Sequence, residues 1–180
     1  MTTESQMVWR SNVRDEIKAW VTDVLSIPSE HFSGLAPCPF AKGCVSRGML
    51  DIDFGDDATV LDRCENWDDR FDLVIIVTED WDHAVITDWC EATNGDLAGM
   101  DLALMAFVPG EGPGTCQPDE ESEDWDYLVD DEYSMVFIQR LSQVNESSRV
   151  LDRQGYYRNC SAEFLEYVKD RRERLDNHAR

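Results

Sequence analysis

Two thiols and a cation lie close together in segment 35–44, Leu-Ala-Pro-Cys-Pro-Phe-Ala-Lys-Gly-Cys. Cys38 stands between two prolines, and Pro39 suits the first position of a helix. We therefore expect Cys38 at a helix N-terminus, where unpaired N–H groups and the helix dipole favour a thiolate. Lys42, one helical turn further on, would add to this bias. The segment predicts a nucleophilic or redox thiol, with Cys44 as the candidate resolving thiol.

The same residues also fit a purely structural role for Cys38. Free cysteine is among the most buried residue types, and flanking prolines make turns without any chemistry. No Cys-x-x-Cys pair occurs among the six cysteines, so the sequence predicts no structural zinc site and indicates no particular cofactor. Reduced thiols are expected, because the cysteines are scattered through a chain of ordinary length; they are residues 38, 44, 64, 90, 116 and 160.

Three further motifs suggest chemistry less strongly. His83 has acidic neighbours in a predicted helix and is a candidate general base, although an exposed helical histidine is the simpler interpretation. Asp51 and Asp53 share one face of a predicted strand and, with Asp56 or Asp57, form a candidate divalent-cation site. Alternating surface aspartates are the simpler interpretation. Segment 110–114 lacks the Gly-Lys-Ser/Thr ending of a phosphate-binding loop and is interpreted as a hinge.

Charge is the most unusual global property of the chain. There are 16 lysines and arginines against 38 aspartates and glutamates, a net charge of −22. Residues 1–139 carry a net charge of −24, whereas residues 140–180 carry +2. Direct binding of nucleic acid is disfavoured, because phosphate contacts need lysine and arginine. The charge suggests an acidic interaction module or inhibitor that competes for a basic, nucleic-acid-binding partner surface. A solvated acidic surface, adaptation to high salt or drift in base composition also explains it.

The densest acidic segment is 119–132, in which nine of fourteen residues are acidic and Trp125 and Tyr127 are interleaved. Such a segment cannot bury enough apolar surface to order itself easily. We predict a mobile acidic loop at 110–132, and a docking segment is the alternative.

Hydrophobic periodicity predicts helices alternating with strands. This order predicts one α/β or α+β domain over residues 1–180, with about four strands in a mixed sheet flanked by helices and a final strand antiparallel at an edge. The expected helices are a first one capped by Ser11 or Asn12 and ended by Pro28, a second over 60–67, a third from 78 to the Asn94-Gly95 pair, short turns over 144–151, and a last one capped by Ser161. The expected strands cover 49–54, 72–78, 102–108 and 133–141.

The chain also indicates where the protein acts. No run of about 18 apolar residues is present, and the polar N-terminus lacks the order of a signal peptide. We therefore expect an intracellular, cytoplasmic protein that does not bind membranes. Its expected partner is an unknown small-molecule substrate or a basic protein.

Residues 38–41, Cys-Pro-Phe-Ala, resemble a motif of an uncharacterised bacterial protein family of similar length, in which the motif follows an N-terminal amphipathic helix. Segments 106–109 and 133–141 stand where that family has an apolar strand ending in Phe-His-Pro and a Tyr-containing segment ending in Arg. Val108 replaces the family's histidine. The resemblance covers residues 13–141 and implies a shared fold and a role for Cys38, with no assigned activity.

The same four residues are similar to the helix entry of omega-class glutathione transferases, where the cysteine is the redox nucleophile. In those enzymes the motif follows a strand, whereas segment 31–35 here is a poor strand. We interpret this local match as convergent.

Two hypotheses therefore stand, a small thiol-dependent enzyme or redox protein and an acidic interaction module. The enzyme needs a pocket beside Cys38. The module needs carboxylates in a regular stripe on rigid elements.

Overall fold

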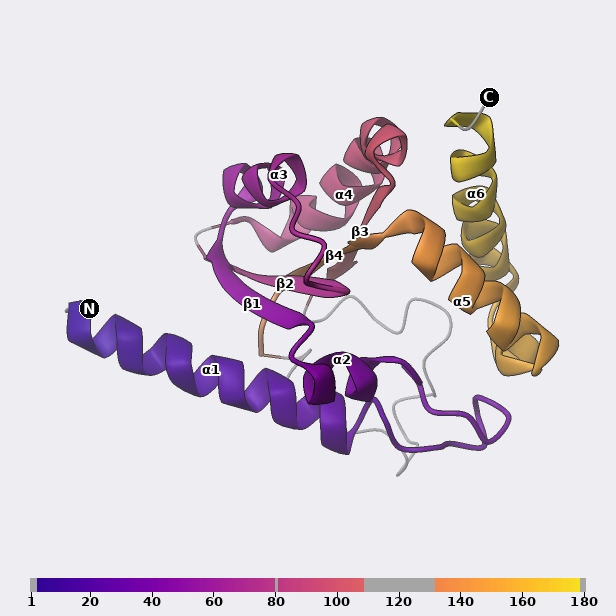
Figure 1. Cartoon of the computed structure of the whole chain (residues 1–180), viewed down its shortest axis with the longest axis horizontal. Coiled ribbons are helices and arrows are strands. Elements are labelled where there is room, and N and C mark those ends of the chain that lie inside the picture. The colour runs from indigo at the N-terminus through magenta and orange to yellow at the C-terminus, as the bar shows by residue number, and fades with distance from the viewer. Residues whose placement is uncertain (1–2, 80, 109–131, 179–180) are drawn as a thin grey trace.

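The computed structural model describes residues 3–79, 81–108 and 132–178. The predicted acidic loop therefore lies outside the described residues, except for Glu132. Within them the chain forms a single-domain α+β fold around one mixed sheet, as the sequence predicts (Figure 1). Among these residues, no helix combines the length and the apolar character needed to cross a membrane.

Four strands form the sheet in the order β1-β2-β4-β3. β1 runs parallel to β2, and β4 runs antiparallel to both of its neighbours, β2 and β3. The prediction that the last strand lies at an edge is therefore wrong. Residues Met135–Ile138 of β4 are at most 6% exposed, so this strand is covered on both faces and suits a central position. The strands are β1 (Leu50–Gly55), β2 (Leu73–Thr78), β3 (Leu102–Phe107) and β4 (Met135–Arg140).

Helices cover both faces of this sheet (Figure 1). Successive residues of β2 point to opposite faces of the sheet. α1 and α2 pack on the face to which Ile75 points, and α3 and α4 pack on the face to which Ile76 points. α5 and α6 form a helical pair beside the end of the sheet. The helices are α1 (Thr3–Asp23), α2 (Ala41–Arg47), α3 (Asp57–Glu65), α4 (His83–Leu97), α5 (Leu141–Arg153) and α6 (Ala162–His178), with short 3₁₀ turns at Ala98–Met100 and Tyr156–Asn159.

Several helix boundaries differ from the predictions. α1 begins at Thr3 instead of near Asn12, because Trp9 packs on Phe54 and Arg10 pairs with Glu79, which gives its first half a tertiary anchor. α4 begins five residues later than predicted and continues past Asn94-Gly95. α5 has 13 residues instead of one or two turns. The predicted cap of α6 is confirmed, since the Ser161 hydroxyl accepts a hydrogen bond from the Phe164 N–H at 3.1 Å.

Candidate functional site

Cys38 lies in the loop that connects α1 to α2. Its N–H donates to the Leu25 carbonyl at 2.9 Å, and its carbonyl accepts from the Ala41 N–H at 3.2 Å. The preceding carbonyl, that of Pro37, accepts a hydrogen bond from the Tyr156 hydroxyl. These bonds fix the loop to the end of α1 and to the connection between α5 and α6. The sequence predicts a helix that begins at Pro39, with Cys38 at its N-terminus. In the structure α2 begins at Ala41, so Cys38 stands three residues before the helix.

The Cys38 side chain is largely covered, and its pKa is raised. Burial, with a smaller contribution from the neighbouring Cys44, raises the pKa to about 11, although the N–H groups of Ala41 and Phe40 act in the opposite direction. N–H groups that lower the pKa of Cys38 are therefore present, as predicted, but burial raises this pKa by more than they lower it. The expectation of a lowered Cys38 pKa is wrong.

The structure places Cys44 close enough to Cys38 to raise its pKa. Lys42 is exposed on α2 and is not among the groups that shift the Cys38 pKa. Cys44 is 7% exposed, with its sulfur 4.0 Å from Asp72 Oδ2. Burial raises the Cys44 pKa, and the Asp72 carboxylate raises it further. Both thiols therefore have pKa values above that of a free cysteine.

The remaining cysteines give no second candidate. Cys64 and Cys90 are buried between the sheet and the α3–α4 layer, as predicted, and burial raises the pKa of each to about 12. Cys160 is disulfide-bonded, so the expectation of reduced thiols does not hold for this residue. Cys116 lies outside the described residues.

Histidine chemistry finds little support. The side chains of His83 and His178 lie outside the part of the chain whose side chains are described. The third histidine, His31, has a buried Nε2 without a hydrogen-bond partner in that part of the chain, and its ring packs edge-on against Phe32. This ring contact indicates a packing role.

Asp51 and Asp53 bind the backbone of their own strand. Asp51 Oδ1 accepts from the Ile52 N–H at 3.0 Å, and Asp53 Oδ1 accepts from the Phe54 N–H at 2.9 Å. The second oxygen of Asp51 pairs with Arg63 of α3. These carboxylates thus already have structural partners. In the described part of the chain, no group of three or more acidic, histidine or cysteine side chains is arranged to hold a metal ion.

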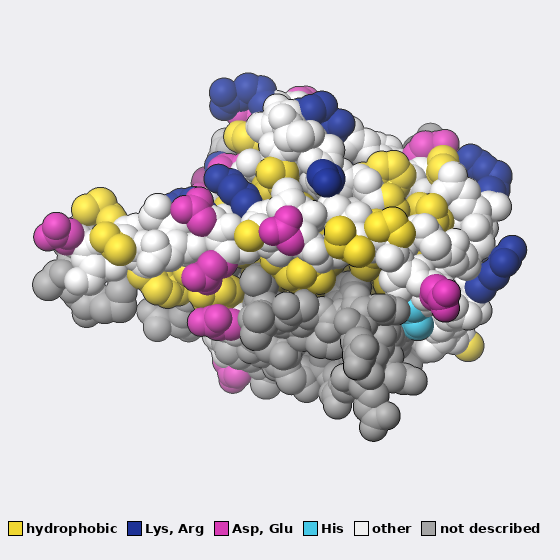
Figure 2. Space-filling view, turned by 90° about the horizontal axis from the view of Figure 1, so that it is seen from below, with side chains coloured by type: hydrophobic (Ala, Val, Ile, Leu, Met, Phe, Trp, Pro, Cys, Tyr) yellow, Lys and Arg dark blue, Asp and Glu magenta, His cyan; other side chains and the backbone are white. Residues whose placement is uncertain are grey.

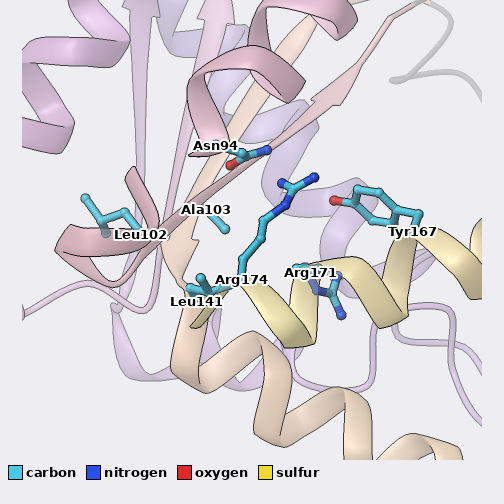
Figure 3. Close-up of a pocket in the computed structure, with 7 residues that line it drawn as sticks. All are labelled: Asn94, Leu102, Ala103, Leu141, Tyr167, Arg171 and Arg174. Carbon is cyan, nitrogen blue, oxygen red and sulfur yellow. The ribbon is translucent and has the colours of Figure 1, made fainter. Parts of the chain in front are cut away.

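A narrow hollow of about 190 Å³, partly open to solvent, lies where α6 meets the start of β3 (Figure 3). Its walls leave no room for a whole water molecule inside it. Figure 3 shows the Arg174 side chain extending from α6 toward Asn94, with the Tyr167 hydroxyl beside it. The lining residues are Asn94, Leu102, Ala103, Leu141, Tyr167, Arg171 and Arg174.

Arg171, in the wall of this hollow, is only 6% exposed. Its Nε donates to Asn145 Oδ1 at 3.2 Å, and Asn145 Nδ2 donates back to the Arg171 carbonyl at 3.3 Å. The guanidinium also lies 5.7 Å from the centre of the Tyr167 ring. This reciprocal pair joins α5 to α6, so Arg171 has a structural role. Nothing in the sequence marked either residue.

A second, shallow hollow of about 650 Å³, widely open to solvent, runs along the first half of α1 and is lined by Glu4, Ser5, Val8, Trp9 and Asn12. Neither hollow touches Cys38. Figure 2 views the face that α1 and α2 form, where apolar side chains are scattered among charges. Near the Cys38 loop, Ile27 and Phe40 are 53% and 47% exposed.

The opposite layer, α3 and α4, is strongly acidic. Residues 56–97 contain 13 acidic residues and only two arginines. Both arginines are already paired, Arg63 with Asp51 and Arg70 with Asp68. Six acidic residues of the two helices are exposed, and we call them the carboxylate face: Asp57, Asp62 and Glu65 on α3, and Asp88, Glu91 and Asp96 on α4.

Comparison of the chain with models of protein families, with curated proteins and with solved structures gave no match. The resemblance of residues 38–41 to an uncharacterised bacterial family therefore stays a prediction.

Proposed function

We propose that this chain is an acidic interaction module that binds a basic protein surface and competes there with nucleic acid. One observation carries the proposal. The carboxylate face presents six exposed acidic side chains on two neighbouring helices, and the only arginines in residues 56–97 are neutralised by other aspartates. An uncompensated negative surface of this kind attracts and orients a positively charged partner.

The supporting helices are rigidly held. Val60 and Cys64 of α3, and Ile86 and Cys90 of α4, are all buried against the sheet. α3 starts with a reciprocal capping box between Asp56 and Thr59. Each helix contains one pair of carboxylates three residues apart, Asp62 and Glu65 on α3 and Asp88 and Glu91 on α4, and the two members of each pair project from the same side. Fixed carboxylates on regular elements are what an acidic mimic of nucleic acid needs.

The thiol-enzyme hypothesis has less support. Desolvation raises the pKa of the Cys38 thiol to about 11, and neither hollow lies against it. Its hydrogen-bonded loop instead ties α1, α2 and the α5–α6 connection together. A packing role accounts for these contacts.

The proposal is tested by titrating a fluorescein-labelled oligo-arginine peptide with the full chain and following its fluorescence anisotropy. The test variant E65Q/D88N/E91Q/D96N removes four charges from the carboxylate face. The control D15N/E30Q/E166Q/D170N removes four exposed charges elsewhere and has the same net charge. We expect the test variant to bind about tenfold more weakly than the control, and the difference to shrink as salt screens it.

Equal weakening in the two variants would contradict the proposal, because attraction would then follow net charge and not a face. Circular dichroism of both variants confirms that they fold. All eight substituted carboxylates are exposed, so we expect no loss of structure.

A further inference from the structure

The outer edge of β1 is unusual for an edge strand. Edge strands expose unpaired N–H and C=O groups that can pair with another chain. Met49 and Gly55 direct their carbonyls to the β2 side, where these accept from the Asp72 and Glu79 N–H groups. Because backbone direction alternates along a strand, the N–H and C=O groups of Ile52 and Phe54 point outward.

Side chains occupy the centre of this outward edge. The Ile52 and Phe54 N–H groups each donate to the aspartate that precedes them, at 3.0 and 2.9 Å. The Ile52 carbonyl accepts from Arg14 Nε of α1 at 3.0 Å. Arg63 of α3 holds the other oxygen of Asp51 from the opposite face of the sheet. The edge therefore has no unpaired donor at Ile52 or Phe54.

A second copy of the chain is the partner whose pairing along this edge the two aspartates would oppose. Antiparallel pairing of two β1 strands about Ile52 places Leu50 of each copy opposite Phe54 of the other, so one face of the pair is apolar. On the other face Asp51 of each copy lies opposite Asp53 of the other, and like charges directly opposite are destabilising. The two aspartates thus accept the hydrogen bonds of the Ile52 and Phe54 N–H groups, and their charges repel a second β1 strand.

We propose that Asp51 and Asp53 close β1 against a second copy of this chain, and that removal of both carboxylates lets two chains pair along β1. The inference rests on the edge alone and is independent of the proposed binding function.

The test compares D51A/D53A, which removes acceptor and charge, with D51N/D53N, which keeps an acceptor oxygen. D88A/D96A on the exposed side of α4 is the control with the same change of net charge. Sedimentation velocity is run from about 5 to about 500 µM, a range that detects dissociation constants in the micromolar region. Backbone amide exchange is followed by NMR near both ends of that range.

We expect the wild type and D88A/D96A to remain monomeric. D51A/D53A dimerises within the same concentration range. Its dissociation constant is at least about tenfold lower than the lower limit set by the data for the two monomeric proteins. Its Ile52 and Phe54 amides exchange rapidly in dilute solution and become protected when it dimerises. D51N/D53N dimerises more weakly, because its side-chain oxygens still compete for these amides.

A folded D51A/D53A variant that stays monomeric over the whole range overturns the inference. So does a dimer in which the Ile52 and Phe54 amides still exchange rapidly, because its interface then lies elsewhere. If D51A/D53A does not fold, D51N/D53N decides the question alone: dimerisation that protects the two amides supports the inference, and a persistent monomer overturns it.

Discussion

Asn94 offers the sharpest test of how the fold is held together. It lies inside α4, is almost fully buried, and pairs with both backbone groups of Leu104 in edge strand β3: Nδ2 donates to the carbonyl at 3.0 Å, and Oδ1 accepts from the N–H at 2.7 Å. The side chain thus takes the place of a neighbouring strand at that point.

Replacement of Asn94 by alanine removes both bonds and leaves two buried backbone groups without a partner. Each such group costs about 1–3 kcal/mol, reduced where water enters the space left behind. We therefore expect N94A to lower the free energy of unfolding by about 2–4 kcal/mol, a large fraction of the stability of a domain of this size. The measurement is urea-induced unfolding followed by circular dichroism.

Two comparisons isolate the cause. N94D keeps the acceptor for the Leu104 N–H but turns a carboxylate oxygen toward the Leu104 carbonyl, so we expect it to be at least as destabilising as N94A at pH 7. D96A, exposed on the same helix, should change stability by less than about 0.5 kcal/mol. The reasoning is refuted if N94A unfolds at the same urea concentration as D96A.

Two other results follow from the titrating groups. Because burial raises the pKa of Cys38 to about 11, iodoacetamide should alkylate Cys38 of the folded protein at pH 7 more slowly than the same cysteine after denaturation; mass spectrometry measures this, and faster labelling in the folded state would contradict it. Hydrogen bonds from Thr59 hold the pKa of Asp56 below its usual value. The stabilisation from this cap is therefore fully present above the unfolded-state pKa and is lost as pH falls through the lower folded-state pKa. The stability difference between wild type and D56A should shrink in that acidic range, and a difference that stays constant there would contradict the assignment.

Local patterns in the sequence were sufficient to predict the strands and the order of the elements. Two examples in which neighbouring residues alone determine the structure are β2, which is apolar from Leu73 to Val77, and the Ser161 cap of α6. Strand order was not predictable in this way. β4 lies between β2 and β3 although the chain enters it only after β3 is complete, and that placement depends on packing across both faces of the sheet.

The errors at single residues have the same origin. Asn94-Gly95 is a good local stop signal, but Leu104 in β3 offers Asn94 two buried hydrogen bonds within a continuing helix. The environment of Cys38 depends on Tyr156, which donates to the Pro37 carbonyl from 119 residues away along the chain. A motif of four residues contains no information about such a contact. The acidic composition was evident from the sequence, whereas its rigid display on α3 and α4 required the fold.

The central claim is that the carboxylate face competes with nucleic acid for a basic surface. The most direct measurement adds the unlabelled chain to a labelled DNA duplex bound by an oligo-arginine peptide and follows release of the DNA by fluorescence anisotropy. We predict release by the wild type and by D15N/E30Q/E166Q/D170N, and about tenfold less effective release by E65Q/D88N/E91Q/D96N. Equal release by both variants, or no release by the wild type, would contradict the claim.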